Sequence, residues 1–298
     1  MKKYSTKDFE RDFPSDDACL EWLFHARWPN GVECEKCGKV TRHYRIEGRP
    51  CYSCEFCGNH VYPMAGTIFE DTRFDHLKLW FKAVAYMSVT RCGVSSRRLS
   101  RDVGVTVKTG YRMWKQIRSV LAEDNAKLTG TVDLDETYID GKAENMHDSK
   151  RAKLGGRGTA GKAAVSGAVE RGGKIGAVAV PNTDGRTLLP QIDKPVDSKA
   201  TVYTDEMGAY KHLPDQGYNH EVVAHSAHIY VNGDVDTNTI EGFWSQLKSS
   251  INGTYHHVTV EHLQEYVDEY TFRYSHRKDE QPMFVTMLKQ VVSHATKT

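Results

Sequence analysis

The sequence predicts a multidomain α+β protein in which a cysteine-rich ribbon and a basic helical region precede an α/β domain. Three observations lead to this prediction. Four cysteines near the N-terminus are paired at metal-binding spacing, an apolar repeat of three to four residues begins after residue 74, and alternation of apolar and polar residues begins after residue 129. The 298 residues suffice for two or three domains at about 100–200 residues each.

The composition is that of a folded protein without a membrane segment. Hydrophobic residues make up 39% and charged residues 27%, which excludes a wholly disordered chain and a collagen. No apolar run reaches the length of about 18 residues that spans a bilayer, so no membrane partner is predicted. Residues 1–14 lack the apolar core of a signal peptide, and we therefore expect a cytoplasmic protein.

Charge is distributed unevenly along the chain. Residues 1–127 contain 22 Lys and Arg against 16 Asp and Glu, a net charge of +6, whereas residues 128–298 contain 18 against 23, a net charge of −5. Two interpretations stay open. Surface charge can fall unevenly by chance, or a basic half that contacts phosphates precedes an acidic half that holds divalent metal ions.

Residues 1–27 are predicted to form a helical segment. Ser15 is placed to cap a helix, because its hydroxyl can accept a hydrogen bond from the first helical turn. Leu20, Leu23 and Phe24 follow at helical spacing and give this helix an apolar face.

The cysteine pattern predicts a zinc ribbon over residues 28–66. Cys34 and Cys37 form one pair and Cys54 and Cys57 a second, with two residues inside each pair and 16 residues between the pairs. Each pair can direct two thiolates at one tetrahedral Zn²⁺, and the gap has room for a short hairpin. A redox-active Cys-x-x-Cys motif does not explain two pairs. An odd total of seven cysteines argues against a disulfide framework.

The three other cysteines are expected to bind no metal. Cys51 lies three residues before a ligand and competes with it on spacing alone, but a buried strand thiol is the preferred interpretation. Cys19 and Cys92 are expected in hydrophobic cores.

Residues 67–127 are predicted to form a helical region with a helix-turn-helix. Ser95 can cap a first helix to Val103, Gly104 suits a tight turn, and Thr106 can cap a second helix. Eight Lys and Arg against one Asp between residues 88 and 120 favour DNA contact. An amphipathic helical pair with a solvated basic face is the alternative. The candidate DNA contacts are Arg97, Arg98, Lys108, Arg112 and Lys115, and Arg118 lies on the same second helix.

The last region alternates strands and helices. Strands are predicted at residues 131–140, 163–170, 175–181 and 201–206, and helices at about 240–251 and 259–275. This order predicts an α/β domain over residues 128–298.

Three acids and one lysine of this domain form a candidate catalytic group. Asp135 lies in the first strand, Asp205 ends the fourth strand, and Glu241 begins a helix with Lys248 about two turns later on the same face. Such carboxylates can hold two divalent ions for phosphodiester chemistry. A chain with 39 acids also yields such triplets by chance, so spacing alone leaves this interpretation open.

Several stretches together resemble a bacterial insertion-sequence transposase with an N-terminal zinc ribbon and a DDE catalytic domain of ribonuclease-H-like fold. The resemblance covers residues from about 13 to 274 and rests on CEKCG…CEFCG, GTIFEDTRF, the segment from residue 93 to 118, VDLDETYIDGK, YTDEMGAY, DTNTIEGFWSQLK and FRYSHR. It implies Asp135, Asp205 and Glu241 as ligands of Mg²⁺ or Mn²⁺, and Lys248 as a DNA contact. Duplex DNA and further copies of the chain are the implied partners, at the bacterial nucleoid.

Two departures bear on the catalytic residues. The last motif contains both Asn238 and Glu241, three residues apart on one helical face, and related groups differ over which is the third catalytic residue. Other acids crowd the first two, and alternation places Asp133 on the same strand face as Asp135. The choice of Asp135 therefore rests on its DETY context. The crowding acids are Asp133, Glu136 and Asp140 beside Asp135, and Glu206 beside Asp205.

The expected activity is DNA cleavage at the ends of an insertion sequence, followed by attack of the freed 3′-hydroxyl on target DNA. Both steps are phosphoryl transfers, so one site can serve both. A regulator derived from a transposase and a nuclease that cuts RNA–DNA hybrids are the alternatives.

Three further features have more than one interpretation. Residues 147–162, rich in Lys, Arg and Gly, are either a solvated loop or a loop that orders on DNA. His225 and His228 either approach the metal site or are structural, the latter being preferred. Trp244 is expected in the core rather than stacked on a base.

Overall fold

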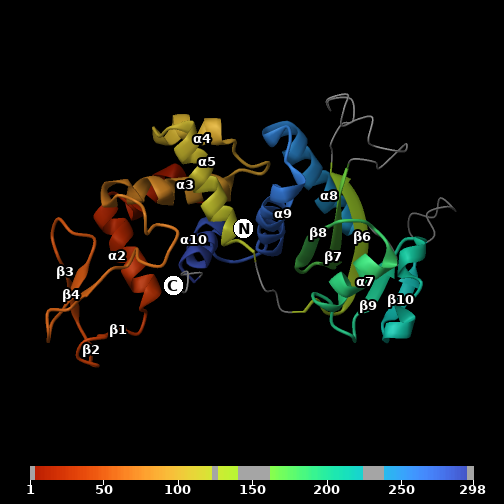
Figure 1. Ribbon diagram of the computed structural model, residues 1–298, viewed down its shortest axis with the longest axis horizontal. Helices are drawn as coiled ribbons and strands as arrows, with labels where there is room; N and C mark the ends of the chain where they lie inside the picture. The colour runs from red at the N-terminus through yellow and green to blue at the C-terminus, as the bar shows by residue number, and fades with distance from the viewer. Residues whose placement is uncertain (1–3, 123–126, 140–161, 224–237, 294–298) are drawn as a thin grey trace. The chain divides into compact units, whose positions relative to one another are not determined.

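The computed structural model describes residues 4–122, 127–139, 162–223 and 238–293 (Figure 1). Two compact units divide the chain. One consists of Met1–Leu121 together with Lys278–Thr298, and the other of Ala122–Arg277. None of the described helices is long and apolar enough to cross a membrane. The protein is mixed α+β, as the sequence predicts.

The first unit combines helices with a small ribbon of short strands. Its described elements are α1 (Thr6–Asp12), α2 (Asp16–Arg27), β1 (Val32–Glu33), β2 (Val40–Thr41), β3 (His43–Arg45), β4 (Tyr52–Cys54), β5 (His60–Val61), a 3₁₀ turn η1 (Phe74–His76), α3 (Leu77–Val89), α4 (Ser96–Val103), α5 (Val107–Ser119) and α10 (Met283–Ser293). The predicted cap of α2 is confirmed, since the Ser15 hydroxyl accepts a hydrogen bond from the Ala18 N–H.

The described helix nearest the C-terminus, α10, belongs to this first unit. It packs against α2 and α3. Its Phe284 contacts Phe13 at a centroid distance of 5.7 Å, and Phe13 in turn lies 5.1 Å from Phe81 of α3. The second unit therefore ends at Arg277, whereas the sequence placed residues 278–298 in the last domain.

The ribbon hairpin forms where the sequence predicts it. β3 pairs antiparallel with β4, and β4 pairs with β5. Gly48 has a φ of 72° in the connecting turn, a backbone conformation that residues with a Cβ rarely adopt.

Two short helices, α4 and α5, follow the predicted pattern of caps and turn. The Ser95 and Thr106 hydroxyls each accept a hydrogen bond from the first turn of the following helix. Gly104 ends α4 in the left-handed conformation, with a φ of 75°. The helices cross closely at Gly110, where a Cβ would meet the Ser96 carbonyl oxygen at 3.0 Å.

A five-stranded mixed sheet forms the second unit. Its elements are β6 (Thr131–Ile139), β7 (Ala163–Glu170), β8 (Ile175–Val180), α7 (Gly185–Asp193), β9 (Thr201–Thr204), two 3₁₀ turns η3 (Gly208–Tyr210) and η4 (Pro214–Gln216), β10 (Asn219–Val222), α8 (Asn238–Ser250), a π-helical turn η6 (Ile251–Tyr255) and α9 (Val260–Ser275). The strand order is β10-β9-β6-β7-β8. β6, β7 and β8 pair antiparallel, whereas β9 and β10 run parallel to β6.

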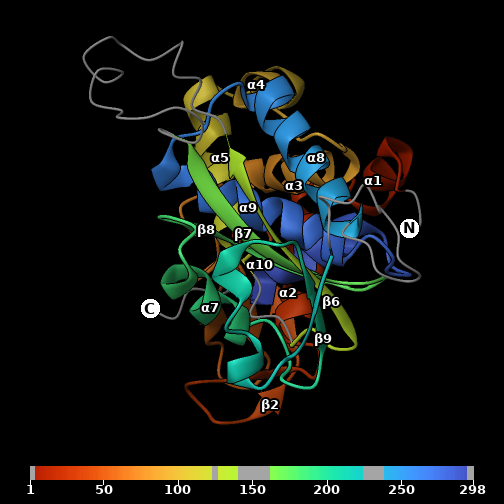
Figure 2. The same cartoon turned by 90° about the vertical axis from the view of Figure 1, so that its right-hand side faces the viewer.

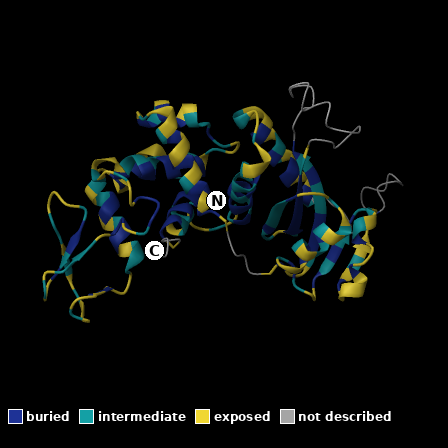
Figure 3. Ribbon diagram, viewed as in Figure 1, coloured by how far each residue is buried: buried dark blue, intermediate teal, exposed yellow. Residues whose placement is uncertain are grey.

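Helices cover both faces of this sheet (Figures 1 and 2). Alternate residues of β6 point to opposite faces, so Leu134 joins a cluster with α7, whereas Ile139 joins a cluster with α8 and α9. Burial is greatest in β6 and β7, near the middle of the sheet, whereas the edge strand β10 is mostly exposed (Figure 3). Because Asp135 and Ile139 are four residues apart, Asp135 points to the face that α8 covers.

Candidate functional site

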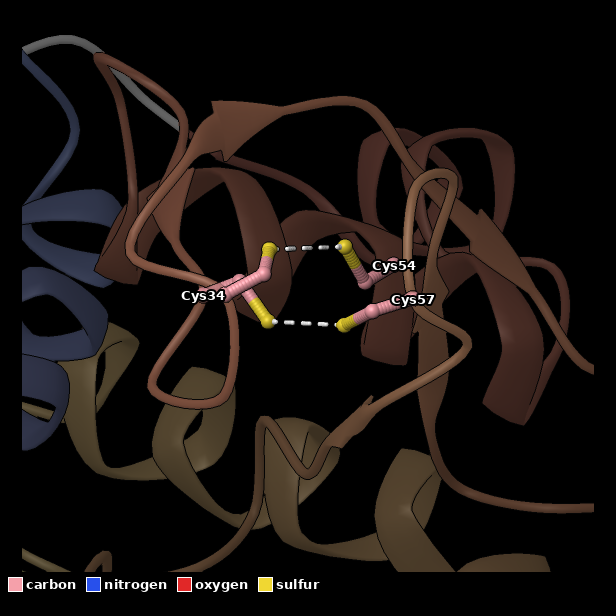
Figure 4. A group of neighbouring side chains, drawn as sticks. Cys34, Cys54 and Cys57 are labelled. Atoms are coloured by element: carbon pink, nitrogen blue, oxygen red, sulfur yellow. Dashed lines mark hydrogen bonds between the residues drawn. The ribbon is translucent and has the colours of Figure 1, made fainter.

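The four predicted zinc ligands lie together in the ribbon. The Sγ atoms of Cys34 and Cys57 are 3.5 Å apart and those of Cys37 and Cys54 are 3.9 Å apart, and all four atoms lie within 4.8 Å of one another. Zn–S bonds of about 2.3 Å in a tetrahedron place the sulfurs about 3.8 Å apart, so the cluster fits one Zn²⁺. Figure 4 shows the thiols of Cys34, Cys54 and Cys57 facing one another.

Both cysteine pairs sit in the same kind of turn. The Gly38 N–H donates to the Cys34 carbonyl at 2.8 Å, and the Gly58 N–H donates to the Cys54 carbonyl at 3.0 Å. Hydrogen bonds from the backbone at Cys37 and then Lys36 lower the pKa of the Cys34 thiol, whereas burial and hydrogen bonds with the neighbouring thiols raise the pKa of Cys57. The turn at Cys34 therefore favours the thiolate form that a metal ion requires.

The remaining cysteines lie outside this group. Cys19 and Cys51 are fully buried, as expected, and Cys51 is not among the clustered thiols. The expectation for Cys92 is wrong, because this residue is exposed in the turn that follows α3.

Asp135, within β6, and Asp205, directly after β9, lie at equivalent places relative to the pairing of these two parallel strands. β6 and β9 pair with Asp133 opposite Tyr203, and each candidate acid lies two residues further along its own chain. The Asp205 Oδ1 accepts a hydrogen bond from the Met207 N–H at 3.0 Å. The parallel register thus brings together two acids that are 70 residues apart in the sequence.

An open hollow of about 640 Å³ joins Asp135 to the exposed face of α8. Glu241 and Lys248 lie on that face, as their seven-residue spacing predicts. The lining residues are Asp135, Glu136, Thr137, Glu241, Trp244, Ser245, Lys248, Ser249 and Asn252. Asp205 is not one of them, although its charge acts on Asp135.

Trp244 connects the helix to the first acid. Its indole is 4% exposed, and its Nε1–H donates to the Asp135 Oδ2 at 2.9 Å. The prediction of a core residue is confirmed. The hydrogen bond to Asp135 was missed, because it joins positions 109 residues apart and no local pattern marks it.

Glu136 is a further acidic residue of the site. Its Oε2 accepts a hydrogen bond from the Tyr210 hydroxyl at 2.7 Å. Burial raises the pKa of Glu136, although the hydrogen bond from Tyr210 opposes the shift and the charge of Asp205 adds to it. Asp133, by contrast, is fully buried in an ion pair with Arg171 at 3.0 Å and does not line the hollow.

The acidic group suits a divalent cation. Burial, followed by the charges of Glu136 and Asp205, raises the pKa of Asp135 to about 7. Carboxylate oxygens are the ligands that Mg²⁺ and Mn²⁺ prefer, and a cation among these acids would offset their repulsion. Among the described residues the carboxylates do not reach the close spacing of the four thiols, so the acidic site is the more open of the two.

The basic residues of α4 and α5 have different environments. Lys108, Arg112 and Lys115 are exposed on one side of α5, and Arg97 is exposed on α4. Arg98 pairs with Asp102 at 2.6 Å.

Val107 and Tyr111 are also exposed, at 49% and 47%, on the side of α5 that carries the lysines. Arg118 is 3% exposed and cannot join that surface.

Some candidates fall outside the described residues. These are Asp140, the Lys- and Gly-rich residues 147–161, His225 and His228. The backbone of Asn238 begins α8, but its side chain is not described.

The chain is similar to transposase domains, to a protein of a transposable element and to a transposase-like protein. Residues 127–275 match the ISXO2-like transposase domain, and residues 14–60 match a transposase zinc-ribbon domain. An uncharacterized protein of the transposable element ISH50 from Halobacterium salinarum is 32% identical over 245 residues, which cover 78% of this chain and 81% of that protein. A transposase-like protein of Haemophilus influenzae is 30% identical over 119 residues, which cover 40% of this chain and 94% of that protein.

Proposed function

Because the chain belongs to the family with an ISXO2-like transposase domain, we propose that it cuts the ends of an insertion sequence and joins the freed 3′-hydroxyl to target DNA. The observation that carries this proposal is the shared hollow of Asp135, Glu241 and Lys248, with Asp205 directly after the adjacent strand β9. The mixed sheet that supports these acids is consistent with a ribonuclease-H-like fold for the second unit.

Three carboxylates, those of Asp135, Asp205 and Glu241, are proposed to hold two Mg²⁺ or Mn²⁺ ions. Such a pair of ions would activate the attacking oxygen and stabilise the leaving oxygen of an in-line phosphoryl transfer. Lys248 lies about two turns from Glu241 and is proposed to contact a phosphate of the bound DNA.

Binding of duplex DNA is assigned to the first unit. Lys108, Arg112 and Lys115 form an exposed basic stripe on α5, which we propose as the recognition helix of a helix-turn-helix. The exposed Val107 and Tyr111 on the same helix are suited to apolar contact with base edges. Because an insertion sequence has two ends, we propose that several copies of the chain act together on DNA.

A strand-transfer assay tests this function. The full chain is incubated with Mg²⁺, a labelled duplex that carries the element's terminal repeat, and a circular target DNA. A transposase produces nicked repeat ends and joined products, and the Asp135→Asn variant produces neither. Binding without cleavage by the unaltered chain would favour a regulator, and cleavage restricted to RNA–DNA hybrids would favour a nuclease.

A further inference from the structure

The indole of Trp244 links the hydrophobic core to one oxygen of Asp135. The ring belongs to the cluster between the sheet and α8, next to Phe243 at a centroid distance of 5.1 Å. Its Nε1–H is a donor only, and the acceptor that it meets is the Asp135 Oδ2 at 2.9 Å. A ring held rigidly by the core therefore fixes the direction of this hydrogen bond.

Gly167 makes room for that ring. It lies opposite Asp135 in the pairing of β6 with β7. A Cβ at this position would lie 2.7 Å from both Cζ2 and Cη2 of Trp244, closer than real Cβ contacts come. These two atoms belong to a buried aromatic ring rather than to the end of a flexible side chain, so displacing them would disturb the packing of the core. A glycine inside a strand is usually unfavourable, and the close approach of the indole explains this one.

The last torsion of an aspartate is broad, so an unsupported carboxylate samples many orientations. A hydrogen bond to one oxygen restricts that torsion and leaves the remaining lone pairs for a metal ion. Partners of this kind orient metal-binding residues in many proteins.

We propose that Trp244 is a positioning residue for the Asp135 carboxylate. This inference rests on the proposed function, which makes Asp135 a metal ligand. Gly167 serves the same purpose, because glycine alone leaves space for the indole at that point of the strand. A purely structural tryptophan would contribute to core packing in the same place without affecting metal binding, and this difference can be measured.

Trp244→Phe separates the two roles, since phenylalanine keeps an aromatic ring in the core and lacks the N–H. The full-length protein is titrated with Mn²⁺ alone, and the increase in Tm gives the concentration for half saturation. We expect this concentration to rise about 10- to 100-fold, the usual effect of losing a partner of a metal ligand. Phe243→Leu is the matched control, because it disturbs the same cluster without removing a hydrogen bond to Asp135. It should lower the starting Tm and keep the half-saturating Mn²⁺ concentration of the unaltered protein.

Gly167→Ala provides a second, independent variant. It should raise the half-saturating Mn²⁺ concentration in the presence of Trp244, because the indole is displaced. On a Trp244→Phe background it should have little further effect, because the ring atoms that it obstructs are gone. The two substitutions are thus expected to be non-additive.

The outcomes separate this inference from the proposed function. Mn²⁺ stabilisation that is lost in Asp135→Asn but unchanged in Trp244→Phe overturns the positioning role alone. Additive effects of the Trp244 and Gly167 substitutions overturn the role given to Gly167. If Mn²⁺ fails to stabilise even the unaltered protein, both the metal site and the positioning role are overturned. If Mn²⁺ binds as expected but no DNA is cut, the positioning role stands and the transposase activity does not.

Discussion

The cysteine cluster and the acidic hollow contrast in how their ligands come together. All four thiols lie within 4.8 Å of one another, and backbone hydrogen bonds at Gly38 and Gly58 hold both turns. The candidate acids come from β6, from the residue after β9, and from α8. Asp135 and Glu241 line an open hollow rather than a closed cage, and Asp205 is not among the lining residues. Cys34 and Cys57 are 23 residues apart, whereas 106 residues separate Asp135 from Glu241.

This difference matches two uses of metal ions in proteins. A closed set of four protein ligands stabilises a fold and leaves no position for a substrate, whereas a catalytic metal site keeps positions open. The ribbon is also too small to fold on apolar burial alone, so a metal ion replaces part of a core. The candidate acids instead lie on a sheet that helices cover on both faces, so we expect this fold to form without the proposed ions.

The largest expected effect is the loss of catalysis in Glu241→Gln. The amide keeps the size of the side chain but removes the charge that offsets two divalent cations. Cleavage of a terminal-repeat duplex should fall by about 10³-fold or more, the scale for a member of a catalytic group. DNA binding, measured by fluorescence anisotropy at fixed salt, should be unchanged, because Glu241 lies outside the unit that carries α5.

Asn238→Ala is the matched comparison within the same motif. An amide offers one neutral carbonyl oxygen to a metal ion, so this variant should cleave more slowly than the unaltered protein yet remain active. An active Glu241→Gln protein together with an inactive Asn238→Ala protein would make Asn238 the third catalytic residue.

Chelation should separate the two metal sites directly. Carboxylates with open positions exchange their ions readily, whereas structural zinc is held by about 10–16 kcal/mol in zinc-finger peptides. Brief dialysis against ethylenediaminetetraacetate should abolish cleavage, and Mg²⁺ should restore it fully. Zinc content, measured by atomic absorption, should stay near one ion per chain throughout. Loss of zinc at the same rate as activity would contradict the distinction.

The zinc ligands can be tested one at a time. Cys37→Ser should lose the bound zinc ion, because three thiolates no longer complete the tetrahedron. Cys51→Ser is the control, since this thiol is buried nearby and is not among the clustered sulfurs. It should retain one zinc ion per chain. Full zinc retention in Cys37→Ser, or its loss in Cys51→Ser, would change the ligand assignment.

The same contrast explains which features the sequence could predict. The ribbon hairpin and the caps at Ser15, Ser95 and Thr106 depend on residues close in the chain, and the structure contains all of them. The strands of the second unit were predicted from alternation, but their order was not. Strand order decides that Asp135 and Asp205 are neighbours, and it depends on contacts between distant segments.

The errors also come from distant contacts. Residues 278–298 were assigned to the last domain by continuity, but an amphipathic helix does not reveal its partner, and α10 packs on α2 and α3. Cys92 was interpreted from residue type alone, and it is exposed rather than in a core. The hydrogen bonds of Trp244 and Tyr210 to the acids link positions 109 and 74 residues apart.

The smallest predicted effect concerns the basic face of α5. This face belongs to neither of the two metal sites. Arg112 and Lys115 are exposed on this helix, and the Arg112 guanidinium lies 5.8 Å from the centre of the Trp80 ring. Each phosphate contact releases counterions, so replacing both residues with Gln should reduce the slope of log K against log salt by about two. Arg98→Gln is the control, because Arg98 already pairs with Asp102 and should change the slope little. Binding measured from 50 to 200 mM salt tests both expectations, and an unchanged slope in the double variant would leave α5 a structural helix.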